Sequence, residues 1–340
     1  MSNSFSLAIG EELIRVVDGQ LSKDKIIINA AAYDNINENI YVDNSGKISI
    51  DTANKIVKLI NDAGISKRQV NIIIPDGFSY TRIIEMPLLS DKELLSAIKY
   101  QADQFIPIAI DNLDLDAITI YQDKSNNKQY ILIVACVKTL IDKISKLVES
   151  SGLIPISIEN EAASTLRIFR HLHLNNDSGD IIFLNFGSTN STICVYDPIN
   201  KFPKNIHNFP IGLNIFQKDM KANFTVDDKK IKDILSSIGF SDNDPNFHLE
   251  KILSSPLTVM SDEINRFILG NKVNLNTSSK QIYLFGEGIN IKNLDGIISK
   301  YVKASVTLLN IQPIIAANTV SNFFNNDWPI FISVLGGVIE

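Results

Sequence analysis

The sequence has few cysteines and no clustered metal ligands. Its two cysteines, Cys136 and Cys194, lie inside apolar, strand-like runs, and no Cys-x-x-Cys or Cys/His cluster is present. We interpret both as small buried side chains and expect neither a disulfide framework nor a metal site. This cysteine usage is typical of a reducing, cytosolic compartment.

Positive charge and long apolar runs are also scarce. The net charge is −6, which argues against nucleic acid as the main partner because phosphate binding needs a basic face. The N-terminus lacks the basic segment and apolar core of a signal peptide. With no run of about 18 apolar residues, we expect no membrane-spanning segment.

What is present is enough apolar sequence for a large packed protein. The 340 residues are 45% hydrophobic and 21% charged, values that favour a globular fold over disorder. At roughly 150 residues per domain, this length predicts about two domains.

The most informative stretch is 180–197. An apolar run at 181–184 and a second at 193–196 flank a small polar turn, a pattern that predicts a β-hairpin. The N–H groups and hydroxyls of such a turn form a concave seat for an anion. An ordinary Gly-Ser hairpin is the alternative. The turn consists of Gly187, Ser188, Thr189, Asn190 and Ser191.

The same pattern occurs near the N-terminus. Apolar runs at 5–9 and 13–17 flank a turn made of Gly10, Glu11 and Glu12. A third glycine turn, 286–288, follows an apolar strand and leads into a helix. The two hairpins predict an internal duplication, and hence two α/β lobes with a ligand-binding cleft between them.

A separate module is expected between the two halves. Residues 78–152 predict the order strand, helix, strand, strand, helix, with Ser90 and Glu93 forming a capping box at the first helix. A strand at 154–158 and a helix at 160–172 return to the first lobe. In the second half we expect helices at 213–221, 227–238 and 248–269, and the apolar stretch 330–339 as a buried helix or strand.

Longer segments resemble a known family. They are MPLLSDKELLSAIKYQADQFIPIAIDNLDLDAITI, ILIVACVKTLIDKISKLVESSGLIPISIENEAASTLRIF, NFPIGLNIFQKDM, DEINRF and IYLFGEGINIKNLDGIISKYV. In order and spacing they are similar to the type IV pilus assembly protein PilM family, within the actin-like ATPase superfamily. The similarity covers nearly the whole chain.

The resemblance implies an α/β, actin-like (ribonuclease H-like) two-lobed fold with an inserted small α+β subdomain. The turns at Gly10, Gly187 and 286–288 then fall in the order of the family's phosphate-1, phosphate-2 and adenosine segments. The expected domains are a first lobe of 1–77 and 153–175 to which 330–340 returns, an inserted subdomain of 78–152, and a second lobe of 176–329 with a smaller part at about 220–275.

The resemblance also implies a weakened ATP site. Ala8 and Asn185 stand where the family has metal-holding aspartates, so we doubt Mg²⁺ binding. Glu11 and Glu12 would repel a triphosphate. Glu263 and Arg266 resemble the pair that flanks the nucleoside, with a surface ion pair as the alternative. The implied cofactor-binding residues are Gly10, Glu11, Glu12, Asn185, Gly187, Ser188, Thr189, Asn190, Ser191, Gly212, Glu263, Arg266, Gly286, Glu287 and Gly288.

The function that the resemblance implies is structural, with no catalytic residues. We expect a cytoplasmic protein, peripheral to the inner membrane, that supports pilus building and retraction. Its expected partners are the cytoplasmic tail of a PilN-like membrane protein, bound between the first lobe and 78–152, other platform proteins and the assembly ATPases. An ATP-hydrolysing protein of a type II secretion or FtsA-like division system is the alternative; unlike FtsA, the chain shows no amphipathic membrane helix after its last expected domain.

Overall fold

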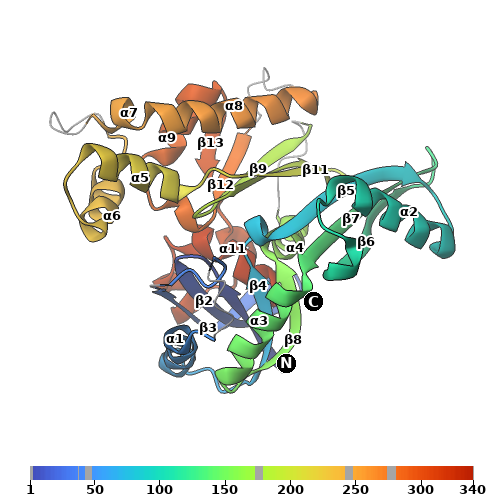
Figure 1. The fold of residues 1–340 in the computed structure, drawn as a ribbon, viewed down its shortest axis with the longest axis horizontal. Coiled ribbons are helices and arrows are strands. Elements are labelled where there is room, and N and C mark those ends of the chain that lie inside the picture. The colour runs from blue at the N-terminus through green and yellow to red at the C-terminus, as the bar shows by residue number, and fades with distance from the viewer. Residues whose placement is uncertain are drawn as a thin grey trace.

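The part of the chain that the structure describes is built on three β-sheets (Figure 1). The computed structural model describes residues 3–36, 38–42, 48–172, 179–241, 248–273 and 281–339. The domain boundary expected at 175–176 lies outside the described residues.

The first sheet has the order β3-β2-β1-β4-β8. The predicted N-terminal hairpin is confirmed, because β1 and β2 pair antiparallel, and β4 and β8 extend the sheet with parallel pairs. Helix α1 begins after Ser49, whose hydroxyl accepts a hydrogen bond from the Thr52 amide. The elements are β1 (Ser4–Ile9), β2 (Leu13–Ser22), β3 (Lys25–Asn35), α1 (Ile50–Asp62), β4 (Gln69–Ile74) and β8 (Ile154–Asn160).

The second sheet repeats this arrangement in the order β11-β10-β9-β12-β13. Strands β9 and β10 form the predicted hairpin, and β12 pairs parallel to β9 just as β4 pairs parallel to β1. The predicted internal duplication is therefore confirmed at the level of topology. The strands are β9 (Ile181–Phe186), β10 (Ser191–Asp197), β11 (Phe202–Phe209), β12 (Gln281–Phe285) and β13 (Ser305–Leu308).

Helices cover the second sheet, and one of them differs from its prediction. The helix expected at 248–269 is divided at Leu253, because Pro256 has no N–H to donate to the carbonyl of residue 252 and is tolerated only in a first turn. The helices are α5 (Leu213–Asn223), α6 (Asp228–Ser237), α7 (Leu249–Ile252), α8 (Ser254–Gly270) and α9 (Leu294–Val302).

The inserted module forms the third sheet, β5-β7-β6, at the right of Figure 1. Its predicted capping box is present in part, since the Glu93 carboxylate accepts hydrogen bonds from the amide (3.0 Å) and the hydroxyl (2.6 Å) of Ser90. The elements are β5 (Ser79–Pro87), α2 (Asp91–Phe105), β6 (Leu113–Asp123), β7 (Lys128–Val137) and α3 (Lys138–Ser150).

The C-terminal part returns to the first lobe earlier than predicted. The expected boundary at 329 is wrong: Ile315 forms a bridge with Ile26 of β3, and the Asn318 side chain donates to the Ile28 carbonyl at 2.8 Å. The apolar stretch expected at 330–339 forms the last returning helix, whereas the two elements before it, within 312–323, are short and carry no helical or strand period that the sequence could reveal. The returning elements are η5 (Gln312–Ile314), α10 (Thr319–Phe323) and α11 (Trp328–Gly336).

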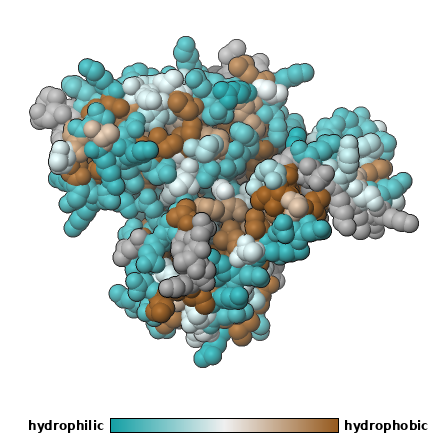
Figure 2. Space-filling view, in the orientation of Figure 1, coloured by the Kyte–Doolittle hydropathy of each residue, from teal (hydrophilic) through white to brown (hydrophobic). Residues whose placement is uncertain are grey.

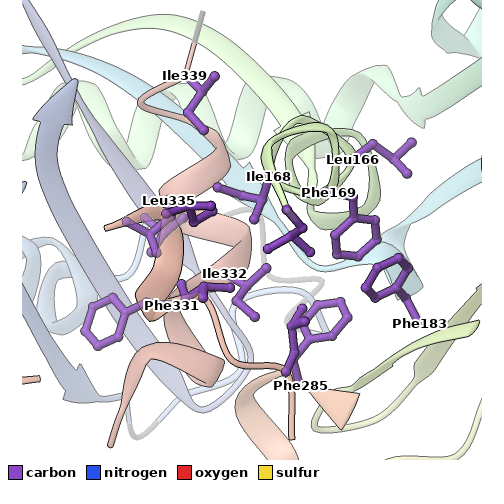
Figure 3. Packing of buried hydrophobic residues seen from close by; sticks show 14 of the residues in the cluster. Leu166, Ile168, Phe169, Phe183, Phe285, Phe331, Ile332, Leu335 and Ile339 are labelled. Carbon is purple, nitrogen blue, oxygen red and sulfur yellow. The ribbon is translucent and has the colours of Figure 1, made fainter. Parts of the chain in front are cut away.

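Helix α11 fills the space between the two lobes. It packs against α4 (Glu161–His171) and also contacts β1, β2 and β12 (Figure 3). Its side chains at Phe331, Ile332 and Leu335 are fully buried, each contributing about 1.5–3 kcal/mol of hydrophobic stabilisation. A helix that is apolar all round is expected in such a central position, and it joins both lobes into one body.

Candidate functional site

The three glycine turns meet in space. A Cβ atom on Gly10 would lie 2.3 Å from the Glu287 carboxylate, and one on Gly288 would lie 2.6 Å from the Gly187 carbonyl oxygen. Gly286 adopts φ +112°, which L-residues rarely adopt. Glycine at these positions therefore allows the backbones of three distant segments to approach one another.

Gly212 belongs to the same assembly. It lies at the start of α5, where the amides of Leu213 and Asn214 donate to the carbonyls of Gly187 (3.0 Å) and Ser188 (2.9 Å). A Cβ on Gly212 would come within 2.4 Å of the Ser188 carbonyl oxygen. The N-terminus of α5 is thus bound to the chain's own second turn.

Glu11 of the first turn lies against Thr189 of the second. One carboxylate oxygen of Glu11 accepts hydrogen bonds from both the amide (3.2 Å) and the hydroxyl of Thr189. The other oxygen accepts from the Asn39 side chain at 2.8 Å. Burial raises the pKa of Glu11, and these hydrogen bonds act in the opposite direction. The donors expected to bind a ligand anion are directed at this side chain.

Glu287 of the third turn makes a second contact with the same turn. Its Oε1 accepts a hydrogen bond from the Ser188 hydroxyl at 2.7 Å, and its Oε2 lies 3.4 Å from the Arg15 guanidinium. Burial raises the pKa of Glu287 to about 7, because the loss of hydration outweighs the opposing charge of Arg15.

Arg15 is the cation at the centre of these carboxylates. Its side chain is 1% exposed, lies 3.2 Å from Glu161, and donates to the Ile330 carbonyl of the returning C-terminal part at 2.6 Å. Glu161 also accepts from the Asn185 side chain (3.1 Å) and the Ser333 hydroxyl (3.0 Å). An aspartate at 185 would place a second carboxylate against Glu161, whereas asparagine donates to it.

Asp76 completes the buried acidic cluster. It accepts hydrogen bonds from the Ala162 amide (2.8 Å) in the first lobe and from the Thr192 hydroxyl (2.7 Å) in the second. Burial, together with the charge of Glu161, raises the pKa of Asp76 to about 7. Near neutral pH part of this cluster is therefore protonated.

The residues present do not fit a nucleotide triphosphate. The hydroxyls of Ser188 and Thr189 are bonded to Glu287 and Glu11, and that of Ser191 donates to the Ile211 carbonyl at 2.6 Å. The remaining cavity measures about 90 Å³, room for roughly three waters. Its lining includes Glu12 and Lys232, which form an ion pair of 2.8 Å. Among the described residues, no three His, Cys, Asp or Glu side chains are placed to hold one metal ion.

Two predicted residues do not join the cluster. Glu263 and Arg266 lie on α8 and pair with each other at 2.6 Å, with Arg266 71% exposed and His207 beside Glu263 at 3.8 Å. The structure thus shows them as a surface ion pair that does not line this cavity. The positions at the cavity are taken by Gln217 and Lys232 of α5 and α6.

The charged side chains that hold the turns together were not predicted from the sequence. Arg15, Asp76 and Glu161 come from separate segments and were not considered for the site. One signal was available for Arg15, since a single arginine inside the apolar run 13–17 requires a buried partner. Nothing local in the sequence identifies that partner.

A larger groove lies where the first lobe meets the inserted subdomain. Its volume is about 680 Å³. The ring of Tyr41 stacks on that of Phe78 at 4.3 Å along one wall, and Lys143 and Lys146 lie on α3. Figure 2 shows hydrophobic surface at this junction, between the lower lobe and the subdomain at the right. The lining residues are Tyr41, Ile48, Gly77, Phe78, Ser79, Tyr80, Val137, Thr139, Leu140, Asp142, Lys143 and Lys146.

Comparison with known proteins decides the family. The family model for the type IV pilus assembly protein PilM matches residues 6–322, almost the full chain. The chain belongs to the PilM family. No curated protein sequence matches it.

Two solved structures show which fold the chain shares. The PilM-family chain is similar to a PilM–PilN type IV pilus biogenesis complex, with a TM-score of 0.81 at 15% identity over 99% of this chain and 98% of that one. It is also similar to the ethanolamine utilization protein EutJ from Carboxydothermus hydrogenoformans, with a TM-score of 0.55 at 11% identity over 98% and 88% of the chains. The fold is actin-like. Among the described residues of this PilM-family chain, no helix has the length and apolarity to cross a bilayer.

Proposed function

We propose that this PilM-family chain is a cytoplasmic scaffold of the type IV pilus platform at the inner membrane. In this role it binds the cytoplasmic tail of a PilN-like membrane protein in the groove between the first lobe and the inserted subdomain. Other platform proteins and the assembly ATPases would act around this unit. The observation that carries the proposal is the groove itself, a cavity of about 680 Å³ away from the acidic cluster.

The groove has the size and chemistry to hold a peptide. Its 680 Å³ lies within the range of roughly 300–1,000 Å³ typical of ligand pockets. Tyr41, Phe78 and Tyr80 supply aromatic surface, the residue type that contributes most to binding free energy. Lys143 and Lys146 add positive charge on the α3 side. These features suit an extended segment with apolar side chains and an acidic group, and the similarity to a PilM–PilN complex supports a PilN-like source for it.

The same proposal assigns no catalysis to the cleft. Hydrolysis of ATP needs phosphates held by free donors, a metal ion and a positioned water. Here the Ser188 hydroxyl and the amide and hydroxyl of Thr189 are bonded to Glu287 and Glu11. Asn185 supplies an amide in place of a carboxylate. We therefore propose a degenerate site with no ATP turnover. The alternative, an ATP-hydrolysing protein of a secretion or division system, has no observation in its favour here.

A binding experiment tests the proposal. The full chain, immobilised, is exposed to a synthetic peptide with the sequence of the cytoplasmic tail of the PilN-like protein encoded nearest to it, with a scrambled peptide as control. We expect selective capture of the tail. Failure of the tail peptide to bind the chain at high micromolar concentration would contradict the proposal. Separately, magnesium-dependent phosphate release that disappears in Gly187→Asp would contradict the absence of turnover.

A further inference from the structure

The second turn already holds an anion, and that anion belongs to the chain. The amide and the hydroxyl of Thr189 converge on one oxygen of Glu11, and the Ser188 hydroxyl donates to Glu287. An amide and hydroxyls aimed at one charged oxygen are the means by which proteins bind phosphate oxygens. The three bonds instead connect the second turn to two carboxylates contributed by the other two turns.

We propose that the Glu11 and Glu287 carboxylates are internal anions that occupy the anion seat of the second turn, close the cleft without any ligand, and exclude phosphate-bearing ligands. This inference concerns a site other than the groove, so it stands or falls independently of tail binding.

Three further observations support the assignment. Gly10 leaves the space that the Glu287 carboxylate enters, since a Cβ there would lie 2.3 Å from its Oε2. Glu11 is held from its other side by Asn39, so its position does not depend on Thr189 alone. Arg15 places its positive charge next to Glu287, and this carboxylate takes the position at Arg15 that a free phosphate would otherwise bind. The carboxylates therefore have both the space and the partners to stay in place.

Removing the internal anions is expected to create a phosphate site. The test compares the wild type with the double variant Glu11→Ala/Glu287→Gln at pH 8, above the pKa of Glu287. Both are titrated with inorganic triphosphate and with ATP in the absence of metal. The proposal predicts no saturable binding by the wild type up to about 1 mM, and affinity at least about tenfold tighter in the double variant. Glu263→Gln, which removes one carboxylate on α8, serves as the control for loss of negative charge away from the cleft and is expected to behave like the wild type.

Two outcomes of the titration would overturn the proposal. One is binding of triphosphate by the wild type as tightly as by the double variant, since the carboxylates would then exclude nothing. The other is a double variant that keeps the circular dichroism spectrum of the wild type and still binds neither probe, since the turn would then be no anion seat.

A measurement on the wild type alone covers the case in which the variant does not fold. Hydrogen exchange of the Thr189 amide reports directly on its bond to Glu11. The proposal predicts that this amide is protected without nucleotide and that ATP leaves its exchange rate unchanged. Rapid exchange that slows when ATP is added would show that the Thr189 amide is not bonded to Glu11 and binds a ligand instead. This result would overturn the proposal.

Discussion

Glu11 and Thr189 join the two lobes through a carboxylate that accepts both the amide and the hydroxyl of its partner. Two other contacts across the cleft have the same direction, whereas the Arg15–Glu287 pair has its acid in the second lobe. Asp76 accepts from Thr192 at 2.7 Å and Glu12 pairs with Lys232 at 2.8 Å, in each case with the acid in the first lobe and the donor in the second. The lobes are thus complementary in charge without a bound ligand.

Stability is expected to fall as pH rises towards neutral. The pKa values of Asp76 and Glu287 are raised to about 7 from ordinary values of 3.8 and 4.5. Between about pH 4 and pH 7 the folded chain binds more protons than the unfolded chain. The stabilisation from these two protonated groups is therefore full below about pH 4 and is lost as pH rises through 7. Urea unfolding should give a free energy of unfolding higher at pH 5.5 than at pH 8, by on the order of a few kcal/mol.

Asp76→Asn should reduce that pH dependence. The amide keeps an acceptor for the Ala162 N–H and offers the Thr192 hydroxyl a donor in place of its present acceptor, while it removes the titrating group. The slope of unfolding free energy against pH should be shallower than in the wild type. An unchanged slope, or a wild-type chain more stable at pH 8 than at pH 5.5, would contradict the assignment.

Loss of Arg15 is expected to destabilise the chain strongly. Arg15→Met leaves the carboxylates of Glu161 and Glu287 buried without their cation and removes the donor to the Ile330 carbonyl. Urea unfolding at pH 8 should show a loss of about 3–5 kcal/mol. Arg266→Met, at an exposed pair, should cost less than about 1 kcal/mol. Equal effects of the two substitutions would argue against the buried cluster.

Gly286→Ala should be costly for a steric reason. Gly286 has φ +112°, and a Cβ there would lie 2.2 Å from Asn185 Oδ1 and 2.6 Å from the Phe186 carbonyl oxygen. We expect a loss of at least about 1–3 kcal/mol in thermal unfolding. Gly270→Ala, at the end of α8 with no atom within 4 Å of its Cβ, should be neutral or mildly stabilising. A Gly286→Ala variant as stable as Gly270→Ala would contradict the close approach of the turns.

The aromatic wall of the groove is expected to carry much of the tail binding. Phe78→Ala removes the ring that stacks on Tyr41, and should weaken tail binding at least about tenfold in a fluorescence titration. Tyr100→Ala removes an aromatic side chain of the same subdomain that is 66% exposed on α2, and should leave the affinity within about twofold. Equal affinities for both variants would place the tail elsewhere.

Local features of the fold were predictable from the sequence. The two glycine hairpins and the Ser90–Glu93 contact depend on neighbours in sequence, and each forms as expected or in part. The duplicated order of strands could be predicted from these hairpins. The return of residues 312–329 to β3 could not be predicted, because the contact of Ile315 with Ile26 involves no local pattern.

The site was predictable only in outline. Glycine composition identified the three turns, but Arg15 meets Glu161 and Glu287 across 146 and 272 residues of sequence, and no spacing rule encodes such contacts. Glu263 and Arg266 show the opposite problem. Their spacing suits both a binding pair and a surface ion pair, and only the position of α8 distinguishes the two.

We propose that the chain recruits a membrane partner through its groove while its cleft stays closed without nucleotide. Fluorescence anisotropy of a labelled tail peptide, titrated with the full chain in the absence and presence of ATP and Mg²⁺, tests it most directly. The account predicts saturable binding with the same affinity in both conditions. Binding that requires ATP, or no binding in either condition, would contradict it.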